Sequence, residues 1–123
     1  MKKSDGKKIK DKISVFISGR GSNLRSIIKY SNQKRSSYRV ELVISNKKNA
    51  KGLILAKKNA IKNYSIDFTE SKKLTDIVLN LLEKNQIKLV CLAGFMRILP
   101  VYFIKSFKGK ILNIHPSLLP KYK

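Results

Sequence analysis

The stretch ISVFISGRGSNL, residues 13–24, decides the fold of this chain. Its first part, Ile13 to Ile17, is short, apolar at most positions and rich in β-branched residues, which is typical of a buried parallel strand. A glycine-rich loop, Gly19 to Ser22, follows at once. A helix then starts near Asn23, with apolar residues at helical spacing on one face. Strand, glycine loop and helix in direct succession predict one βα unit of an α/β sheet.

The rest of the chain repeats this alternation. Further strands are predicted over residues 39–44, 63–68, 88–93 and 110–115, and helices over 50–59 and 72–85, with a short helix whose first turn opens at Pro100. Strands that alternate with helices indicate βαβ units, a parallel sheet and right-handed crossovers. We therefore expect an α/β fold, a Rossmann-like parallel sheet with helices on both faces. Residues 88–93 form the most hydrophobic strand and are predicted to be central.

Length and composition favour a single globular domain. A chain of 123 residues with 42% hydrophobic residues can bury a small core. No apolar run in the sequence approaches the ~20 residues that cross a bilayer, and the basic N-terminus lacks the apolar core of a secretory signal. We expect a basic disordered tail over residues 1–11, a domain over 12–123 and a cytoplasmic location. The single cysteine, Cys91, predicts neither an internal disulfide nor a metal site.

The charge is strongly basic, with 28 Lys and Arg against 7 Asp and Glu and a formal net charge of +21. Such a balance is compatible with nucleic-acid binding through phosphate neutralisation, with a preference for anionic small molecules, or with a lysine-rich composition without a dedicated partner. The lysines are scattered over predicted helices, loops and both termini, and no zinc-finger or RNP-type signature accompanies them. We favour the third interpretation and expect no specific nucleic-acid partner.

Unusual residues follow three of the predicted strands. They are residues 19–23 after the first strand, 94–97 after the fourth, and Asn113 with His115 at the end of the fifth. In open α/β sheets, ligands bind beyond the carboxyl ends of the strands. All three groups are therefore expected to line one edge of the sheet, and this convergence carries more weight than any single motif.

The glycine loop is the first candidate binding site. Backbone N–H groups at a helix N-terminus, together with the helix dipole, favour a phosphate there. A dinucleotide site is the alternative, but the third glycine of its fingerprint falls at Leu24, and Ser45 and Asn46 stand where an acidic residue is expected. We favour a phosphomonoester over a dinucleotide, and a tight turn without a ligand remains open. A bulky residue at Gly21 is expected to abolish ligand binding and leave the fold intact.

Two further segments carry chemistry. Asn113 and His115 are two apart on a strand and so project to the same side. An amide donor beside an imidazole suits the stabilisation of an oxyanion and the movement of a proton, although a lone histidine satisfied by local hydrogen bonds is an equal alternative. The loop over residues 93–99 carries bulky apolar residues and one arginine, and it either walls a pocket for a flat heterocycle or packs into the core.

Three longer segments carry a family resemblance. They are ISGRGSNL (residues 17–24), LAGFMRIL (92–99) and LNIHPSLLPKY (112–122). In this order they resemble the signatures of the phosphoribosylglycinamide formyltransferases, also called glycinamide ribonucleotide transformylases. The run VISN, residues 43–46, is in register with the same family. The resemblance covers essentially all residues after about Lys12.

The resemblance implies a folate-dependent transferase of purine biosynthesis. It implies that a formyl group moves from 10-formyltetrahydrofolate, the co-substrate, to the amine of 5-phosphoribosylglycinamide, without a covalent enzyme intermediate and without a metal. By the resemblance, Gly21, Ser22 and Asn23 hold the substrate phosphate, and Met96, Arg97, Ile98 and Leu99 border the folate pocket. Asn113 binds the formyl oxygen, and His115 assists the tetrahedral intermediate.

The sequence departs from the family pattern at two places. The family has an arginine that contacts folate just before the long helix, where this chain has Lys72 or Lys73, and a lysine loses the bidentate geometry. The family also continues well beyond Tyr122, and its later half supplies a catalytic aspartate. The resemblance therefore predicts an N-terminal part of the domain, and a 123-residue chain that is by itself a poor catalyst.

Two alternatives to this function stay open from the sequence. Methionyl-tRNA formyltransferases share the Asn-x-His-Pro-Ser-Leu-Leu-Pro segment, and a basic surface would suit their tRNA. They lack the GxGSNL loop, so residues 21–24 argue against them. A non-enzymatic cationic protein that binds anions or nucleic acid is the second alternative.

Overall fold

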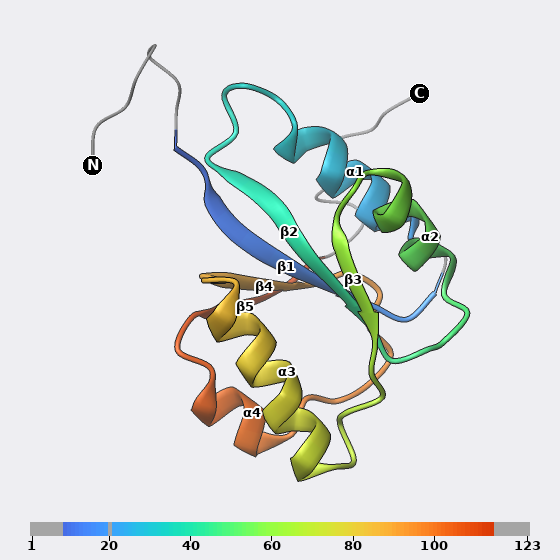
Figure 1. Cartoon of the computed structure of the whole chain (residues 1–123), viewed down its shortest axis with the longest axis vertical. Helices are drawn as coiled ribbons and strands as arrows, with labels where there is room; N and C mark the ends of the chain where they lie inside the picture. The colour runs from blue at the N-terminus through green and yellow to red at the C-terminus, as the bar shows by residue number, and fades with distance from the viewer. Residues whose placement is uncertain (1–8, 20, 115–123) are drawn as a thin grey trace.

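Figure 1 shows the computed structural model of the chain, in which residues 9–19 and 21–114 are described. Within these residues, five strands form one sheet in the order β3-β2-β1-β4-β5. The elements are β1 (Asp11–Ile17), α1 (Ser22–Ser31), β2 (Tyr38–Ser45), α2 (Lys51–Lys58), β3 (Lys62–Ser65), α3 (Lys72–Lys84), β4 (Leu89–Leu92), α4 (Val101–Ser106) and β5 (Lys110–Asn113). All neighbouring strands pair in parallel, so the predicted α/β fold is confirmed.

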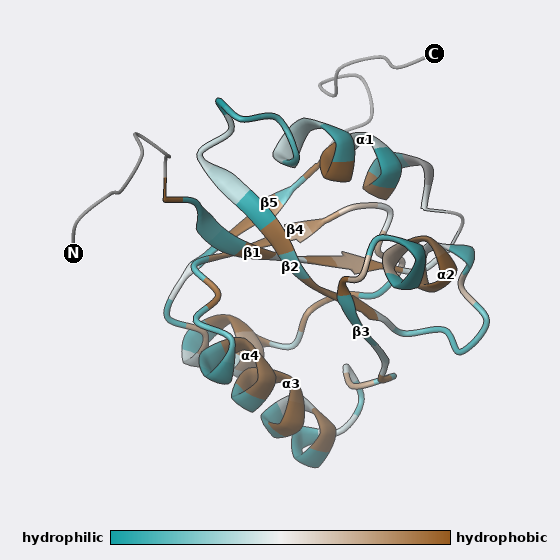
Figure 2. Ribbon diagram, turned by 45° about the horizontal axis from the view of Figure 1, so that its top comes forward, coloured by the Kyte–Doolittle hydropathy of each residue, from teal (hydrophilic) through white to brown (hydrophobic). Residues whose placement is uncertain are grey.

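Helices cover both faces of the sheet, as predicted. Helices α1 and α2 lie on one face, and α3 and α4 lie on the other (Figures 1 and 2). Strand β1 shows why both faces are buried. Ile13, Val15 and Ile17 belong to the core under α1 and α2, and Phe16 belongs to the core under α3 and α4. Because neighbouring side chains of a strand point to opposite faces, one apolar run supplies both cores.

Aromatic side chains dominate the core beneath α3 and α4. The ring of Phe16 lies 5.7 Å from those of Phe68 and Phe95 and 5.9 Å from that of Phe103, between ring centroids. Phe68 and Phe95 stack at 6.1 Å. Offset-stacked and edge-to-face pairs of this kind add about 0.5–1.5 kcal/mol each to the burial of their area. This cluster ties the segments after β3 and β4 to the middle of the sheet.

The sheet differs from the sequence prediction at its centre and edges. The middle strand is β1, with β4 beside it, although β4 is the more hydrophobic. Strand β3 ends at Ser65 rather than at residue 68, because Phe68 leaves the ladder and packs into the core with no exposed surface. Strand β5 ends at Asn113, although the N–H of Ile114 still donates to the carbonyl of Leu92 at 2.9 Å.

The boundaries near the N-terminus and Pro100 also differ from expectation. The predicted tail over residues 1–11 overlaps the sheet, because Asp11 already pairs with Tyr38 in the β1–β2 ladder. Lys10 is also fixed, since its ammonium donates to the carbonyls of Ser31 and Gln33 at 2.7 and 2.8 Å. Pro100 is the N-cap of α4 in an extended conformation and not a residue of its first turn.

Candidate active site

The carboxyl ends of β1 and β4 form the switch point of the sheet. The chain leaves β1 towards β2 on one side, whereas β4 pairs on its other side. In open α/β sheets a crevice for ligands forms at such a point, because the two connections depart in opposite directions. The glycine loop after β1 and the loop after β4 both begin here. The structure therefore brings together two of the three predicted groups at one edge.

Gly21 turns the chain from β1 into α1. Its φ of 85° lies in the left-handed region, and its carbonyl accepts the N–H of Arg25 at 2.8 Å as the helix begins. A side-chain Cβ at Gly21 would lie 2.7 Å from the Cα of Gly52. The expectation that a bulky residue here would leave the fold intact is therefore wrong, because the new atom would collide with the backbone of α2.

Gly52 packs against the glycine loop and belongs to none of the predicted motifs. It lies in the first turn of α2, and its N–H donates to the carbonyl of Gly19 at 3.3 Å. A Cβ at Gly52 would lie 2.2 Å from the Cδ1 of Ile17. Glycine inside a helix is unfavourable by about 1 kcal/mol relative to alanine. That unfavourable choice was the available signal of a close backbone approach.

The N-terminus of α1 has the chemistry of an anion site. The first N–H groups of a helix have no acceptor within the helix, and the dipole makes this end positive. The first turn of α1 contains no acidic residue that would repel an anion. Asn23 is half-buried beside it. Ser22 begins the helix, and its side chain lies outside the described part of the structure.

The loop after β4 exposes apolar side chains at the same edge. Met96 and Ile98 are 76% and 91% exposed, whereas Leu99 is buried in the core and Phe95 packs against the aromatic cluster. Of the two alternatives predicted for this loop, packing into the core is therefore correct for Phe95 and Leu99 and wrong for Ile98. Met96 and Ile98 are free to contact a ligand, and the side chain of Leu99 is not.

Arg97, at the same loop, forms an ion pair with Asp67. Their side chains lie 3.0 Å apart and are 38% and 51% exposed. An exposed pair of this kind contributes about 0–1 kcal/mol, so exchange of Asp67 for a ligand carboxylate is inexpensive. Arg97 therefore remains available as a cation.

Lys72, the first residue of α3, is bound within a small cluster. Its ammonium lies 3.3 Å from Asp76 and 4.7 Å from the ring centroid of Tyr102, whose hydroxyl donates to Asp76. Hydrogen bonds with Tyr102 and then Asp76 raise the pKa of Lys72 above its ordinary value. The cluster joins α3 to α4, and Lys72 stays charged at neutral pH. Lys73, the other candidate for the folate contact, is exposed.

The third predicted group lies one strand further along. Asn113 ends β5, pairs with Leu92 of β4 and is exposed. It therefore stands next to the start of the loop after β4. His115 lies outside the described residues, so its predicted partnership with Asn113 remains a prediction.

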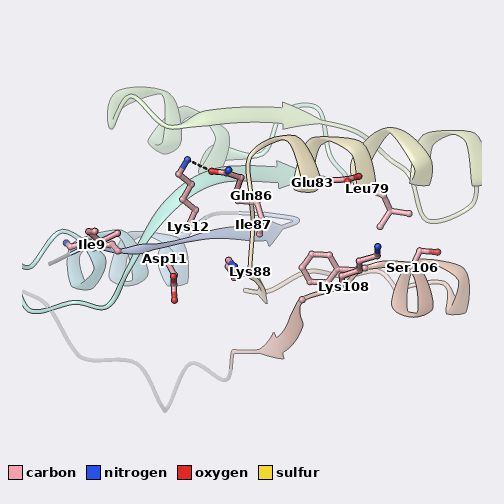
Figure 3. A pocket seen from close by; sticks show the side chains of 13 residues that line it. Ile9, Asp11, Lys12, Leu79, Glu83, Gln86, Ile87, Lys88, Ser106 and Lys108 are labelled. Carbon is pink, nitrogen blue, oxygen red and sulfur yellow. Dashed lines mark hydrogen bonds between the residues drawn. The ribbon is translucent and has the colours of Figure 1, made fainter. Parts of the chain in front are cut away.

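Two other features do not contribute to this site. Burial raises the pKa of the Cys91 thiol to about 11, so that it is neutral and a poor nucleophile at pH 7. A cavity of about 650 Å³ lies at the opposite edge of the sheet, where Lys12 and Lys88 stand at the amino ends of β1 and β4 (Figure 3). Figure 3 also shows the hydrogen bond from Lys12 to Gln86, 3.3 Å long.

Residues 9–19 and 21–114 contain neither a metal-holding cluster nor a membrane-spanning helix. No group of three or more His, Cys, Asp or Glu in this part of the chain could hold a metal ion. None of its helices is long and apolar enough to cross a membrane.

Known proteins share both the sequence pattern and the fold of this chain. The sequence model of the formyl transferase family matches residues 11–123. The chain belongs to the formyl transferase family. Among solved structures, this formyl transferase superposes on phosphoribosylglycinamide formyltransferase from Brucella melitensis with a TM-score of 0.79 and 33% identity, over 93% of its own residues and 61% of that chain. The structure from Anaplasma phagocytophilum gives a TM-score of 0.76 at 40% identity, over 91% of this chain and 53% of that one.

Curated relatives of this formyl transferase include a formyltransferase and a purine biosynthetic protein. It is 42% identical over 114 residues to phosphoribosylglycinamide formyltransferase of Haemophilus influenzae, and 44% identical over 117 residues to the trifunctional purine biosynthetic protein adenosine-3 of Gallus gallus. These matches cover 90% and 93% of the chain. The chain spans 54% of the bacterial relative and 12% of the trifunctional one.

Proposed function

We propose that this formyl transferase acts in purine biosynthesis as a phosphoribosylglycinamide formyltransferase. In this function a formyl group leaves 10-formyltetrahydrofolate and joins the amine of 5-phosphoribosylglycinamide. The observation that carries the proposal is the anion site at Gly21 and α1, set beside an exposed apolar loop at the switch point of the sheet. The names of the relatives favour this function over that of a methionyl-tRNA formyltransferase.

The phosphate of the ribonucleotide binds at the N-terminus of α1 in this proposal. Ser22 and Asn23 add hydrogen bonds, and the left-handed turn at Gly21 leads the chain into the helix whose N-terminus receives the phosphate. A phosphate carries close to two negative charges at pH 7. The net charge of +21 therefore favours its approach to the protein.

The folate binds against the loop after β4. Met96 and Ile98 contact the flat heterocycle, and the loop backbone at Leu99 borders it. Arg97 and Lys72 are the nearby cations for the folate carboxylates, each now paired with an acidic side chain that an anionic ligand would replace. Both ion pairs are exposed enough for that exchange.

The transfer itself is an addition followed by an elimination. The substrate amine attacks the formyl carbon, and the carbonyl oxygen becomes an oxyanion that the amide of Asn113 stabilises. His115 assists proton movement from the attacking nitrogen to N10 of the folate, whose bond to the formyl carbon then breaks. The products are the formylated amine and tetrahydrofolate, so neither a covalent enzyme intermediate nor an oxidant takes part. A cytoplasmic location belongs to the same proposal.

Binding of the ribonucleotide to the intact chain tests the proposal. Titration calorimetry with 5-phosphoribosylglycinamide is expected to show one site. Gly19 has open space around its Cβ position, so Gly19→Leu is expected to obstruct the loop without a backbone collision and to weaken binding about ten-fold or more. Ser65→Leu is the matched control on an exposed position of another strand end. Equal binding by the unmodified chain and Gly19→Leu would refute the anion site.

Catalysis is tested in a joined protein. The chain is fused to the C-terminal part of the Haemophilus influenzae relative, and formyl transfer from 10-formyltetrahydrofolate is measured. We expect turnover in the fusion and a loss of roughly 10²–10⁴-fold in its His115→Ala variant, which is the usual contribution of general acid–base catalysis. A fully active His115→Ala fusion would contradict the role given to His115.

A further inference from the structure

The hydroxyl of Ser18 bridges three strand ends at the switch point. Ser18 follows β1 and is 1% exposed. Its hydroxyl donates to the side-chain carbonyl of Asn46, which follows β2. The same oxygen accepts the N–H of Met96, in the loop after β4, at 2.7 Å. One side chain thus contacts both neighbours of the central strand.

The position of these bonds matters because the backbone ladders end just before them. The β1–β2 pairing closes with Ile17 opposite Ser45, and the last bond between β1 and the β4 side runs from the N–H of Ala93 to the carbonyl of Phe16 at 2.9 Å. The strand pairing ends at these residues. The Ser18 side chain continues the pairing one step further on both sides.

We infer that Ser18 is a positioning residue that fixes the glycine loop and the loop after β4 at a constant spacing across the switch point. Ser18 is bonded covalently to Gly19, the first residue of the glycine loop, and through its hydroxyl to Met96, an exposed residue of the apolar loop. In the proposed function, on which this inference rests for its catalytic consequence, these loops hold the two substrates. Ser18 therefore aligns the amine with the formyl group without touching either.

The chain contains a matched control for this role. Ser14 lies within β1, is also fully buried, and its hydroxyl has no hydrogen-bond partner among the described residues. Ser14→Ala and Ser18→Ala each remove one buried hydroxyl oxygen. Only the second removes hydrogen bonds, so a difference between the two variants measures the bonds and not the lost oxygen.

Hydrogen exchange of the Met96 amide tests the link directly and needs no activity. In Ser18→Ala we expect this amide to exchange about ten-fold faster than in the unmodified chain, and in Ser14→Ala at an unchanged rate. Ser18→Cys, which keeps a weak donor and acceptor, is expected to lie between them and replaces Ser18→Ala if that variant does not fold. Unchanged exchange in Ser18→Ala, or equal acceleration in Ser14→Ala, would overturn the inference.

A second test of the positioning role asks whether ligand binding at the glycine loop changes hydrogen exchange in the loop after β4. Saturation with 5-phosphoribosylglycinamide is expected to slow exchange at Met96 in the unmodified chain and in Ser14→Ala, and to leave it unchanged in Ser18→Ala, although that variant still binds the ligand. Slowing of the same size in all three proteins would refute the role. If the unmodified chain bound no ribonucleotide, the proposed function would fail, whereas the ligand-free exchange rates would still decide whether Ser18 holds the loop.

Discussion

The loops after β1 and β4 lie at the same edge of the sheet and are built in opposite ways. The glycine loop contains two glycines, and its backbone at Gly21 lies close to α2 at Gly52. The loop after β4 turns through Gly94, whose φ of 69° is also left-handed but whose Cβ position is open. It is held from beneath by Phe95 and exposes Met96 and Ile98.

The contrast follows from what each loop presents. A phosphate is bound by backbone N–H groups, so the first loop needs a fixed backbone and no bulk in front of it. A heterocycle is bound by apolar area, so the second loop needs side chains held outward from an anchored base. Residues that look alike in sequence, such as Gly21 and Gly94, therefore carry different constraints.

Alanine at Gly21, compared with alanine at Gly94, should give the largest effect. Gly21→Ala combines left-handed strain of about 1–2 kcal/mol with overpacking of about 1–3 kcal/mol against Gly52. Gly94→Ala carries the strain alone. Urea denaturation is expected to show the loss of unfolding free energy at Gly21 exceeding that at Gly94. Equal losses would mean that the contact with Gly52 does not constrain the loop.

Removal of the aromatic anchor should release the second loop alone. Phe95→Ala is expected to lower the free energy of unfolding by about 2 kcal/mol, below the 3–5 kcal/mol of a fully buried phenylalanine, because Phe95 is half-buried. Phe107→Ala, at a half-buried ring that stacks on Phe103 at 5.9 Å, is the control. Hydrogen exchange over residues 94–99 should accelerate only in the first variant, and acceleration in both would argue for general loosening.

Removal of an exposed apolar side chain from the loop after β4 should weaken folate binding without lowering the stability of the fold. Ile98→Ser is expected to change the free energy of unfolding by no more than about 0.5 kcal/mol, because the side chain is 91% exposed. A non-transferable folate analogue should bind about ten-fold more weakly, since the isoleucine no longer covers it. Ile54→Ser, at a 57% exposed isoleucine of α2, should leave that affinity unchanged. Identical affinity in both variants would place the folate elsewhere.

The smallest effect concerns the link between α3 and α4. The hydrogen bond from Tyr102, helped by Lys72, holds the pKa of Asp76 below its ordinary value, whereas partial desolvation raises it. A lowered folded-state pKa stabilises the protein above the unfolded pKa, and the contribution is lost as pH falls through the folded value. An NMR titration should show the pKa of Asp76 rising in Tyr102→Phe. An unchanged pKa would exclude the hydroxyl as its main cause.

Local sequence patterns predicted most of the fold, because the apolar residues of each strand or helix follow the spacing typical of that element. The apolar run of β1 and the stripe of α3 were recognisable without any tertiary contact. Strand order was not, because the middle position of β1 depends on crossover direction and not on its own hydrophobicity. The third strand was predicted to extend to Phe68 because a buried apolar residue in a loop cannot be distinguished by its residue type from one in a sheet.

Candidate site residues could be predicted where they belong to sequence motifs, but not where their role depends on packing against distant residues. Strand ends and resemblance made Gly21 and Asn113 candidates. The contacts of Gly52 and Ser18 could not be predicted, because each is made to a residue far away in sequence, Gly21 or Met96. Leu99 was assigned to the pocket with its neighbours, but only a structure separates a buried side chain from exposed ones in one short segment.

The strand order also has a consequence for synthesis on the ribosome. Strand β1 is made first, yet it lies in the middle of the sheet, and its partner β4 begins only at Leu89. At translation rates of about 5–20 residues per second, the roughly 70 intervening residues take several seconds to emerge. During that interval β1 can pair with β2 but its other flank has no native neighbour. The nascent chain thus presents an unpaired apolar strand edge, which is a surface that chaperones bind and that other nascent chains can join.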